Sequence, residues 1–317
     1  MISTLLNVAP QRASNIAREV DSAFLLITAI SVAMLIGITL CMIYFVIRYS
    51  RTRNPNPSMI EGHKGLELLW TVVPTILVLG MFYYGWRGFD VMRSPPVGAM
   101  EVHVVARKWS WLFEYTAIEN GKTKTVPSEV LVLPIGKPVK LLLRSEDVIH
   151  SLFIPEFRVK EDAVPGTPTW LWFIPEREGT FEIFCAEYCG LNHSRMRALV
   201  QVVSAKAFEE FTAKPVPPRL VGRTLVRSVC ASCHSLDGAP SVGPTFKGLL
   251  GRKSAVKENG KPLTVEVTED YIRESIREPN RKIVDGFPAN VMQVQNLSDA
   301  DVAAILEYLR TIHEAKD

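Results

Sequence analysis

Residues 185–196 read Cys-Ala-Glu-Tyr-Cys-Gly-Leu-Asn-His-Ser-Arg-Met, which places two thiols, an imidazole and a thioether within one short stretch. A further histidine, His150, precedes this stretch by about 35 residues. Sulfur ligands combined with imidazoles favour copper, and a weakly bound methionine is the usual axial ligand of copper electron-transfer sites. Two cysteines can also bridge a pair of metal ions. We therefore interpret residues 185–196 as part of a copper site that transfers electrons.

A structural zinc site and a disulfide are the alternatives to copper in this stretch. Structural zinc sites favour a tighter C-x2-C spacing and rarely use methionine. A disulfide between Cys185 and Cys189 would leave two histidines and Met196 without a role. Both alternatives account for fewer of the residues than copper does.

The copper motif lies in a region, residues 98–204, that is typical of an all-β domain. Seven short apolar or alternating segments predict strands, and turn residues such as Asn120-Gly121 and Pro165-Gly166 separate them. We expect a β-sandwich or small barrel. The predicted strands are 101–106, 109–115, 130–133, 139–144, 169–174, 179–184 and 196–203.

The N-terminal part contains two apolar runs long enough to cross a membrane. Residues 24–47 carry no charge, and the second predicted span, 68–88, includes Pro74, which should kink its helix. A cleavable signal peptide would have a shorter apolar core than residues 24–47. The connecting loop is rich in arginine, so the positive-inside rule places it in the cytoplasm. The N-terminus and everything after residue 90 then face the outer side.

Charge is distributed unevenly along the 317 residues. Residues 1–97 hold eight Lys or Arg and five Asp or Glu, which accounts for the net charge of +3. The remaining two thirds are nearly balanced, and no run of basic residues alternates with aromatics. This pattern argues against nucleic acid as a partner.

A second motif follows a proline-rich stretch at residues 214–219, which predicts a stiff linker. Cys230-Ala-Ser-Cys233-His234 is the C-x-x-C-H signature, in which two thiols attach haem covalently and the histidine binds iron. A redox dithiol would match the same five residues. Met292 is the only methionine beyond residue 234 and is the candidate second axial ligand, with His313 as its competitor.

Residues from about 20 to 205 resemble subunit II of the haem-copper cytochrome c oxidases. The resemblance rests on Asp147-Val-Ile-His150-Ser, on Val164-Pro-Gly166 and on the 185–196 stretch. It implies a dinuclear copper centre, CuA, and a magnesium ion shared with subunit I through the Glu187 side chain. The implied CuA ligands are His150, Cys185, the Glu187 carbonyl, Cys189, His193 and Met196.

Two further positions match that family. Trp109 corresponds to the tryptophan at which electrons enter, whereas Trp111 is better explained as a core aromatic. The family more often has tyrosine between these two tryptophans, so Ser110 is a departure from its pattern. Glu67 resembles the glutamate at the cytoplasmic mouth of a proton pathway, and an ordinary interface charge is the alternative.

Residues 219–313 resemble class I cytochrome c. Gly222 would allow the first and last helices of that fold to cross closely, with Tyr308 packed nearby. The Gly243-Pro244 pair matches the loop whose proline carbonyl orients the haem-binding histidine, here His234. A subunit II with such a domain at its C-terminus resembles oxidases of the caa type.

Four segments are therefore expected: an N-terminal part with two transmembrane helices (1–97), a cupredoxin-like CuA domain (98–213), a linker (214–219) and an all-α cytochrome c domain (220–317). The resemblance implies that electrons pass from a donor, through haem c and CuA, to subunit I of a proton-pumping oxidase, where oxygen is reduced to water.

The implied partners are subunits I and III, membrane lipid, and as donor either a cytochrome c or an adjacent respiratory complex. The implied location is the bacterial inner membrane, with both globular domains on the periplasmic side. Three alternatives differ in partner or purpose. A quinol oxidase subunit would lack the copper ligands, a nitric oxide reductase subunit would differ in its partner chain, and a copper-assembly module would not need a haem.

Overall fold

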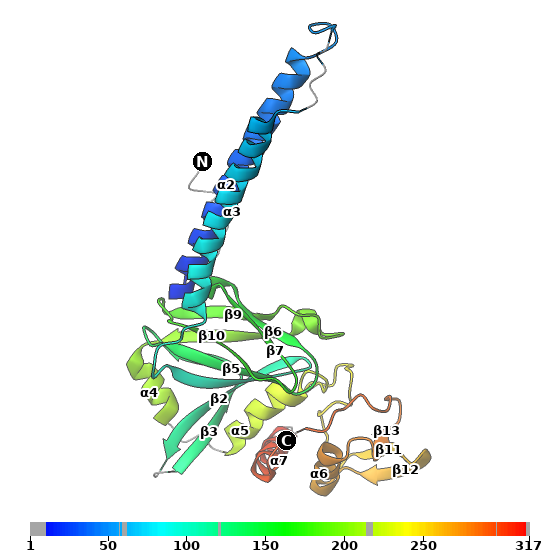
Figure 1. Ribbon diagram of the computed structural model, residues 1–317. Helices are drawn as coiled ribbons and strands as arrows, with labels where there is room; N and C mark the ends of the chain where they lie inside the picture. The colour runs from blue at the N-terminus through cyan, green and yellow to red at the C-terminus, as the bar shows by residue number, and fades with distance from the viewer. Residues whose placement is uncertain are drawn as a thin grey trace.

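The computed structural model describes residues 11–56, 58, 62–119, 122–213, 218–295 and 297–314. Helices α2 (Asn15–Arg48) and α3 (Lys64–Met92) form a long antiparallel hairpin that projects from the rest of the molecule (Figure 1). Both predicted spans lie within these helices, and Pro74 lies inside α3. Most large apolar side chains along the hairpin are exposed, as expected of helices that face lipid.

The central domain consists of two five-stranded sheets packed face to face. The strand orders are β3-β2-β1-β5-β8 and β4-β10-β9-β6-β7. All seven predicted strands are present, and the structure adds β3, β6 and β7. The bounds are β1 Met100–Arg107, β2 Ser110–Glu119, β3 Lys122–Ser128, β4 Val130–Pro134, β5 Val139–Ser145, β6 His150–Ile154, β7 Val159–Ala163, β8 Thr169–Phe173, β9 Gly179–Cys185 and β10 Arg197–Val203. The expected turn at residues 120–121 lies outside the described residues.

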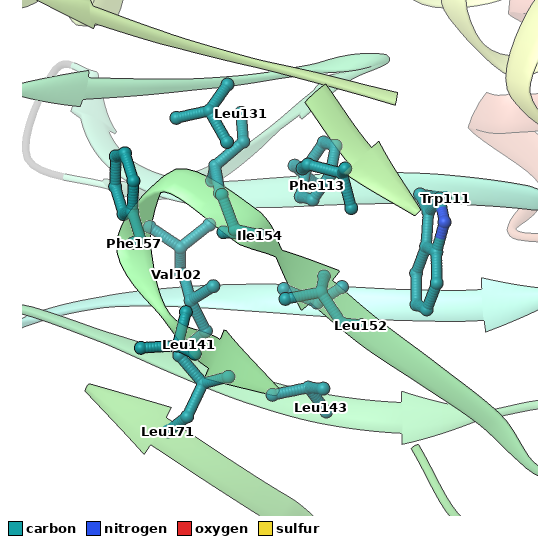
Figure 2. Packing of buried hydrophobic residues seen from close by; sticks show 14 of the residues in the cluster. Val102, Trp111, Phe113, Leu131, Leu141, Leu143, Leu152, Ile154, Phe157 and Leu171 are labelled. Carbon is teal, nitrogen blue, oxygen red and sulfur yellow. The ribbon is translucent and has the colours of Figure 1, made fainter. Parts of the chain in front are cut away.

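Alternating side chains of both sheets fill the space between them (Figure 2). In β2, for example, Trp111 and Phe113 point inward and are buried, and they meet Leu152 and Ile154 of β6 from the other sheet. Successive residues of a strand face opposite sides, so this period of two produces one apolar face per sheet. The packing creates a rigid frame from which the loops of the domain project.

Side-chain contacts at the start of α2 and at the end of α3 join the membrane hairpin to the β domain. Ser14 caps α2, and its hydroxyl donates to the Phe157 carbonyl at 2.8 Å. At the end of α3, the Trp172 indole nitrogen donates to the Val91 carbonyl at 3.1 Å. Arg158 pairs with Asp21 at 2.8 Å, further along α2. These contacts fix the β domain relative to the two helices.

The C-terminal domain is helical, as expected, but it also carries a small sheet, β12-β11-β13, that the sequence analysis did not predict. It lies on the side of the β domain away from the hairpin (Figure 1). Residues 214–217 of the expected linker lie outside the described residues, and 218–219 begin α5. The bounds are α4 Ala205–Ala213 (within the expected CuA segment), α5 Pro218–Leu225, a π-helical turn η3 Val226–Cys230, β11 Lys253–Glu258, β12 Lys261–Glu266, α6 Glu269–Arg277, β13 Lys282–Val284 and α7 Asp299–Glu314.

The first and last helices of this domain cross at Gly222. A Cβ atom there would lie 1.9 Å from the Ala304 carbonyl oxygen of α7, so only glycine allows the two backbones to approach this closely. Tyr308, also on α7, belongs to the apolar cluster of this domain, together with Leu225 of α5. The crossing therefore fixes the distance between α5 and α7.

Replacement of Gly222 by alanine should therefore destabilise the C-terminal domain by about 1–3 kcal/mol, because α5 and α7 must move apart. Thermal unfolding followed by circular dichroism would show a lower midpoint. Ala303→Leu is the matched control, because it adds a side chain at an exposed position of α7 beside the crossing. An unchanged midpoint for Gly222→Ala would contradict the close crossing.

Candidate copper centre and haem site

The loop that connects β9 to β10 carries most of the predicted copper ligands. Cys185 ends β9 and Met196 directly precedes β10, and the backbone N–H of Cys185 donates to the Met196 carbonyl at 3.2 Å. Between them Gly190 has a φ of +114°, which residues with side chains rarely adopt. The antiparallel strands thus bring the two ends of residues 185–196 together.

All six predicted ligands gather at this loop. The two cysteine sulfurs are 3.8 Å apart, and the Glu187 carbonyl oxygen lies 3.2 Å from Cys185 Sγ. His150 and Met196 are completely or almost completely buried, whereas Glu187 is exposed. The remaining donor distances are His150 Nδ1 to Cys185 Sγ, 3.9 Å; His193 Nδ1 to Cys189 Sγ, 3.6 Å; and Met196 Sδ to Cys189 Sγ, 3.8 Å.

The protonation of the two thiols reflects this crowding. Burial raises the pKa of Cys185, but the His150 imidazole and backbone N–H groups outweigh burial and lower it overall. Burial and then the negative charge of Cys185 raise the pKa of Cys189. Two thiolates this close repel each other, and a bound cation removes that repulsion. The donor set therefore fits a soft metal cation held by both sulfurs.

Asp147 orients His150 from behind. Its carboxylate accepts from His150 Nε2 at 2.8 Å, which leaves Nδ1 directed toward the sulfurs. It also accepts from the backbone N–H of Lys108 at 2.7 Å. Such a carboxylate fixes the tautomer of a ligating imidazole. The sequence motif contains Asp147 without indicating this role, and the only signal for it is the spacing of three residues between Asp147 and His150.

The two tryptophans of the predicted entry segment occupy different environments. The Trp109 indole nitrogen donates to the Cys189 carbonyl at 3.2 Å, and its ring packs against Gly190. Trp111 is 2% exposed and belongs to the core, where its ring meets that of His150 edge-on at 6.2 Å. Trp109 is thus in contact with residues 185–196, which we call the copper loop. The interpretation of Trp111 as a core aromatic agrees with its burial.

A second site is centred on His234. Its Nδ1 lies 2.7 Å from the Pro244 carbonyl oxygen, so this nitrogen donates a proton and Nε2 remains available to a metal. Phe246 stacks on the ring with centroids 4.6 Å apart. A Cβ on Gly243 would lie 2.7 Å from the imidazole, so this glycine makes room for the ring. Burial lowers the pKa of His234 and favours the neutral imidazole that a metal requires.

The remaining predicted residues lie in separate elements. Cys230 ends the π-helical turn, and Cys233 follows it in a short turn. Met292 lies in the irregular segment before α7, and its competitor His313 lies in α7 itself. Glu67 lies in the first turn of α3, at the end of the hairpin away from the β domain (Figure 1).

Comparison with known proteins matches all three parts of the chain. Family models described as "Cytochrome C oxidase subunit II, periplasmic domain", "Cytochrome C oxidase subunit II, transmembrane domain" and "Cytochrome c" match residues 108–203, 5–85 and 221–313. Cytochrome c oxidase subunit 2 of Cereibacter sphaeroides is 30% identical over 229 residues, which cover 62% of this chain and 76% of the relative.

The chain belongs to the cytochrome c oxidase subunit II family. A relative from Alkalihalophilus pseudofirmus with the name cytochrome c oxidase subunit 2 is 28% identical over 316 residues, and the match covers 90% of this chain and 86% of the relative. The solved periplasmic domain of subunit II (CoxB) of Bradyrhizobium japonicum is 25% identical, with a TM-score of 0.32, over 38% of this chain and 94% of that one.

As a subunit II with a cytochrome c domain, the protein is an electron-transfer subunit of a terminal oxidase, with a membrane hairpin and a periplasmic domain. The family implies copper and haem, and both donor sets fit these groups. Two thiols, two imidazoles and a thioether suit copper, and a half-buried imidazole oriented by the Pro244 carbonyl, in a motif with two free thiols, suits a c-type haem.

Replacement of Asp147 by asparagine should weaken copper binding by about 10–100-fold, because the amide cannot accept both the His150 and the Lys108 protons. Competition with a copper chelator would measure this loss. Asp162→Asn is the matched control, since that carboxylate bonds Ser151, beside the ligand, and not the ligand itself. Equal affinity in both variants would contradict the orienting role.

Replacement of Gly243 by alanine should displace the His234 ring and break its bond to the Pro244 carbonyl, because the added methyl overlaps the imidazole. The expected result is less correctly ligated haem per chain, measured by iron content and absorption spectra, with copper content unchanged. Ala239→Val adds bulk at an exposed position of the same loop and should leave both unchanged. Normal spectra for Gly243→Ala would contradict this account.

Proposed function

We propose that this chain receives electrons at its cytochrome c domain and delivers them, through the copper loop, to subunit I of the oxidase. The observation that carries the proposal is that one chain brings the six candidate copper donors into one cluster of contacts and also holds a C-x-x-C-H motif whose histidine is oriented by the Pro244 carbonyl. Copper at the first site and haem at the second would supply the centres that accept and release electrons.

Five of the proposed copper ligands lie in the loop of residues 185–196, and the sixth, His150, begins the neighbouring strand β6. The loop would supply both cysteine sulfurs to the copper, and the buried Met196 thioether lies beside Cys189. Because the donors are already fixed by strands on both sides, they need to move little when the charge of the site changes. The proposed ligands are His150, Cys185, the Glu187 carbonyl, Cys189, His193 and Met196.

For the haem, we propose covalent attachment through Cys230 and Cys233, with His234 and Met292 as axial ligands. Burial raises the pKa of both thiols, so neither is activated as an isolated redox dithiol would be. A methionine ligand would raise the reduction potential of the haem. The Pro244 carbonyl holds the His234 ring in the orientation that the iron requires.

Three further assignments extend the proposal to the partners. Trp109, in contact with Cys189, is the entry point for electrons to the copper loop. The exposed carboxylate of Glu187 binds magnesium together with subunit I, since its own carbonyl points the other way, toward Cys185. Glu67, at the far end of the hairpin, lies at the mouth of a proton pathway in subunit I.

The location and the remaining partners follow from the orientation of the hairpin. Arg48, Arg51 and Arg53 lie at its tip, which favours a cytoplasmic tip and periplasmic domains. We propose the inner membrane of a bacterium, with subunit III in the same complex. The proposed donor is a cytochrome c or an adjacent respiratory complex.

Metal analysis and absorption spectra of the purified full chain test this proposal. We expect one iron and two coppers per chain, with a sharp reduced band of a c-type haem and a broad near-infrared band when oxidised. Cys185→Ser should lose copper and keep haem, because the two sites share no ligand. Iron without copper in the unaltered chain would overturn the proposal, and copper without covalent haem would remove the electron-receiving role of the C-terminal domain.

A further inference from the structure

The outer face of the β1–β2 pair is covered by the cytochrome c domain. Val105 and Leu112 lie opposite each other on these strands and point away from the core of the β domain. Both are buried nevertheless, at 0% and 3% exposure, in an apolar cluster with residues of the C-terminal domain. Val226 and Val229 of the π-helical turn belong to this cluster. An apolar pair on the outer face of a sheet marks a packed interface.

Arg107 links the two domains beside this apolar pair. It lies two residues after Val105 on the same face and is 6% exposed. Its Nη2 pairs with Glu146 of the β domain at 2.6 Å, while its Nη1 donates to Gln295 of the cytochrome c domain at 2.7 Å. The planar guanidinium holds both partners in fixed directions, and a buried cation is stable only when it is paired in this way.

The same contact brings the haem-attachment loop to the copper side. Ser232, in the middle of the C-x-x-C-H motif, has its hydroxyl 3.4 Å from the Lys108 carbonyl oxygen. Lys108 directly precedes Trp109, whose indole bonds the Cys189 carbonyl. A continuous path of covalent bonds and polar contacts therefore runs from the Cys230–His234 loop to a copper ligand.

The charge of Arg107 also acts on the haem site. Burial raises the pKa of the Cys230 thiol, and the nearby Arg107 cation opposes that rise. The guanidinium is thus close enough to interact electrostatically with the attachment site. A positive charge in this position favours the reduced form of a group that gains an electron.

We propose that Arg107 is a positioning residue that holds the cytochrome c domain on the β1–β2 face, so that electrons pass from the Cys230–His234 loop to Lys108–Trp109 without movement of the domain. This inference rests on the proposed function. It extends that function because it assigns the electron path within the chain to one interface. It also excludes a mechanism in which the cytochrome c domain swings between its donor and the copper loop.

Arg107→Gln in the full, copper- and haem-loaded chain tests the inference. Glutamine removes the cation and cannot bridge Glu146 and Gln295, so the docked fraction should fall by about tenfold or more. Transient absorption after photoreduction of the haem should show electron transfer to copper slowed by that factor. The reduction potential of the haem should also fall, and hydrogen exchange of residues 105–112 should increase.

Arg227→Gln is the matched control. Arg227 lies in the cytochrome c domain and also pairs across the domain boundary, but its contact with Glu129 of the β domain is long, 3.7 Å, and both side chains are substantially exposed. Such pairs contribute little, so the electron-transfer rate should change by less than about threefold. Arg107→Lys keeps the positive charge but cannot contact both Glu146 and Gln295. Relative to Arg107→Gln, it should restore the reduction potential of the haem more fully than the rate of electron transfer to copper.

A second interface variant covers the case in which Arg107→Gln fails to bind haem. Leu112→Gln leaves every polar contact in place and removes part of the apolar interface, and it should also slow the internal transfer by about tenfold. Unchanged rates in whichever of these two variants carry both centres would overturn the inference and leave the proposed function intact. Absence of copper or haem in the unaltered chain would instead overturn the proposed function.

Discussion

The backbone hydrogen bond from Cys185 to Met196 is the contact on which the copper loop depends. It continues the antiparallel ladder of β9 and β10 by one step, so the two ends of the loop are fixed by the sheet and not by the metal. Within that closed loop the sulfurs of Cys185, Cys189 and Met196 have little freedom to separate. The ladder itself rests on the core between the two sheets, so the precision of the site derives from the packing of the whole β domain.

Electrostatics then make this preformed loop a cation site. Two buried thiols cannot both lose their protons at low cost, and the thiolate of Cys185 makes ionisation of Cys189 harder. Bound copper compensates both charges, so metal binding and proton release are coupled. Asp147 contributes in a second way, because it holds His150 and the Lys108 backbone at once. One carboxylate therefore fixes both the His150 imidazole and the backbone that leads to Trp109.

Most of the architecture could be predicted from local sequence, and the exceptions have physical reasons. Strands such as β5 and β9 alternate clearly between buried and exposed residues. In contrast, β7 contains three charged residues in a row, and β11 and β12 each begin with lysine and end with glutamate, so their strand pattern is obscured. The candidate copper donors could be predicted because four of the side-chain donors lie within residues 185–196. The contact between Arg107 and Gln295 could not, because it joins residues 188 positions apart through the packing of two domains.

The short connection between the domains keeps the cytochrome c domain close to the β1–β2 face. The four residues 214–217 join α4 to α5 and can span no more than about 18 Å in any conformation. A tether of this length keeps the cytochrome c domain at an effective concentration of roughly millimolar order beside the β domain, so the contacts at Arg107 and the Val105–Leu112 pair decide whether it docks. The docked domain contacts the backbone just before Trp109. Because Trp109 in turn bonds the Cys189 carbonyl, the docking proposed above implies that an external donor reduces the cytochrome c domain before the copper loop.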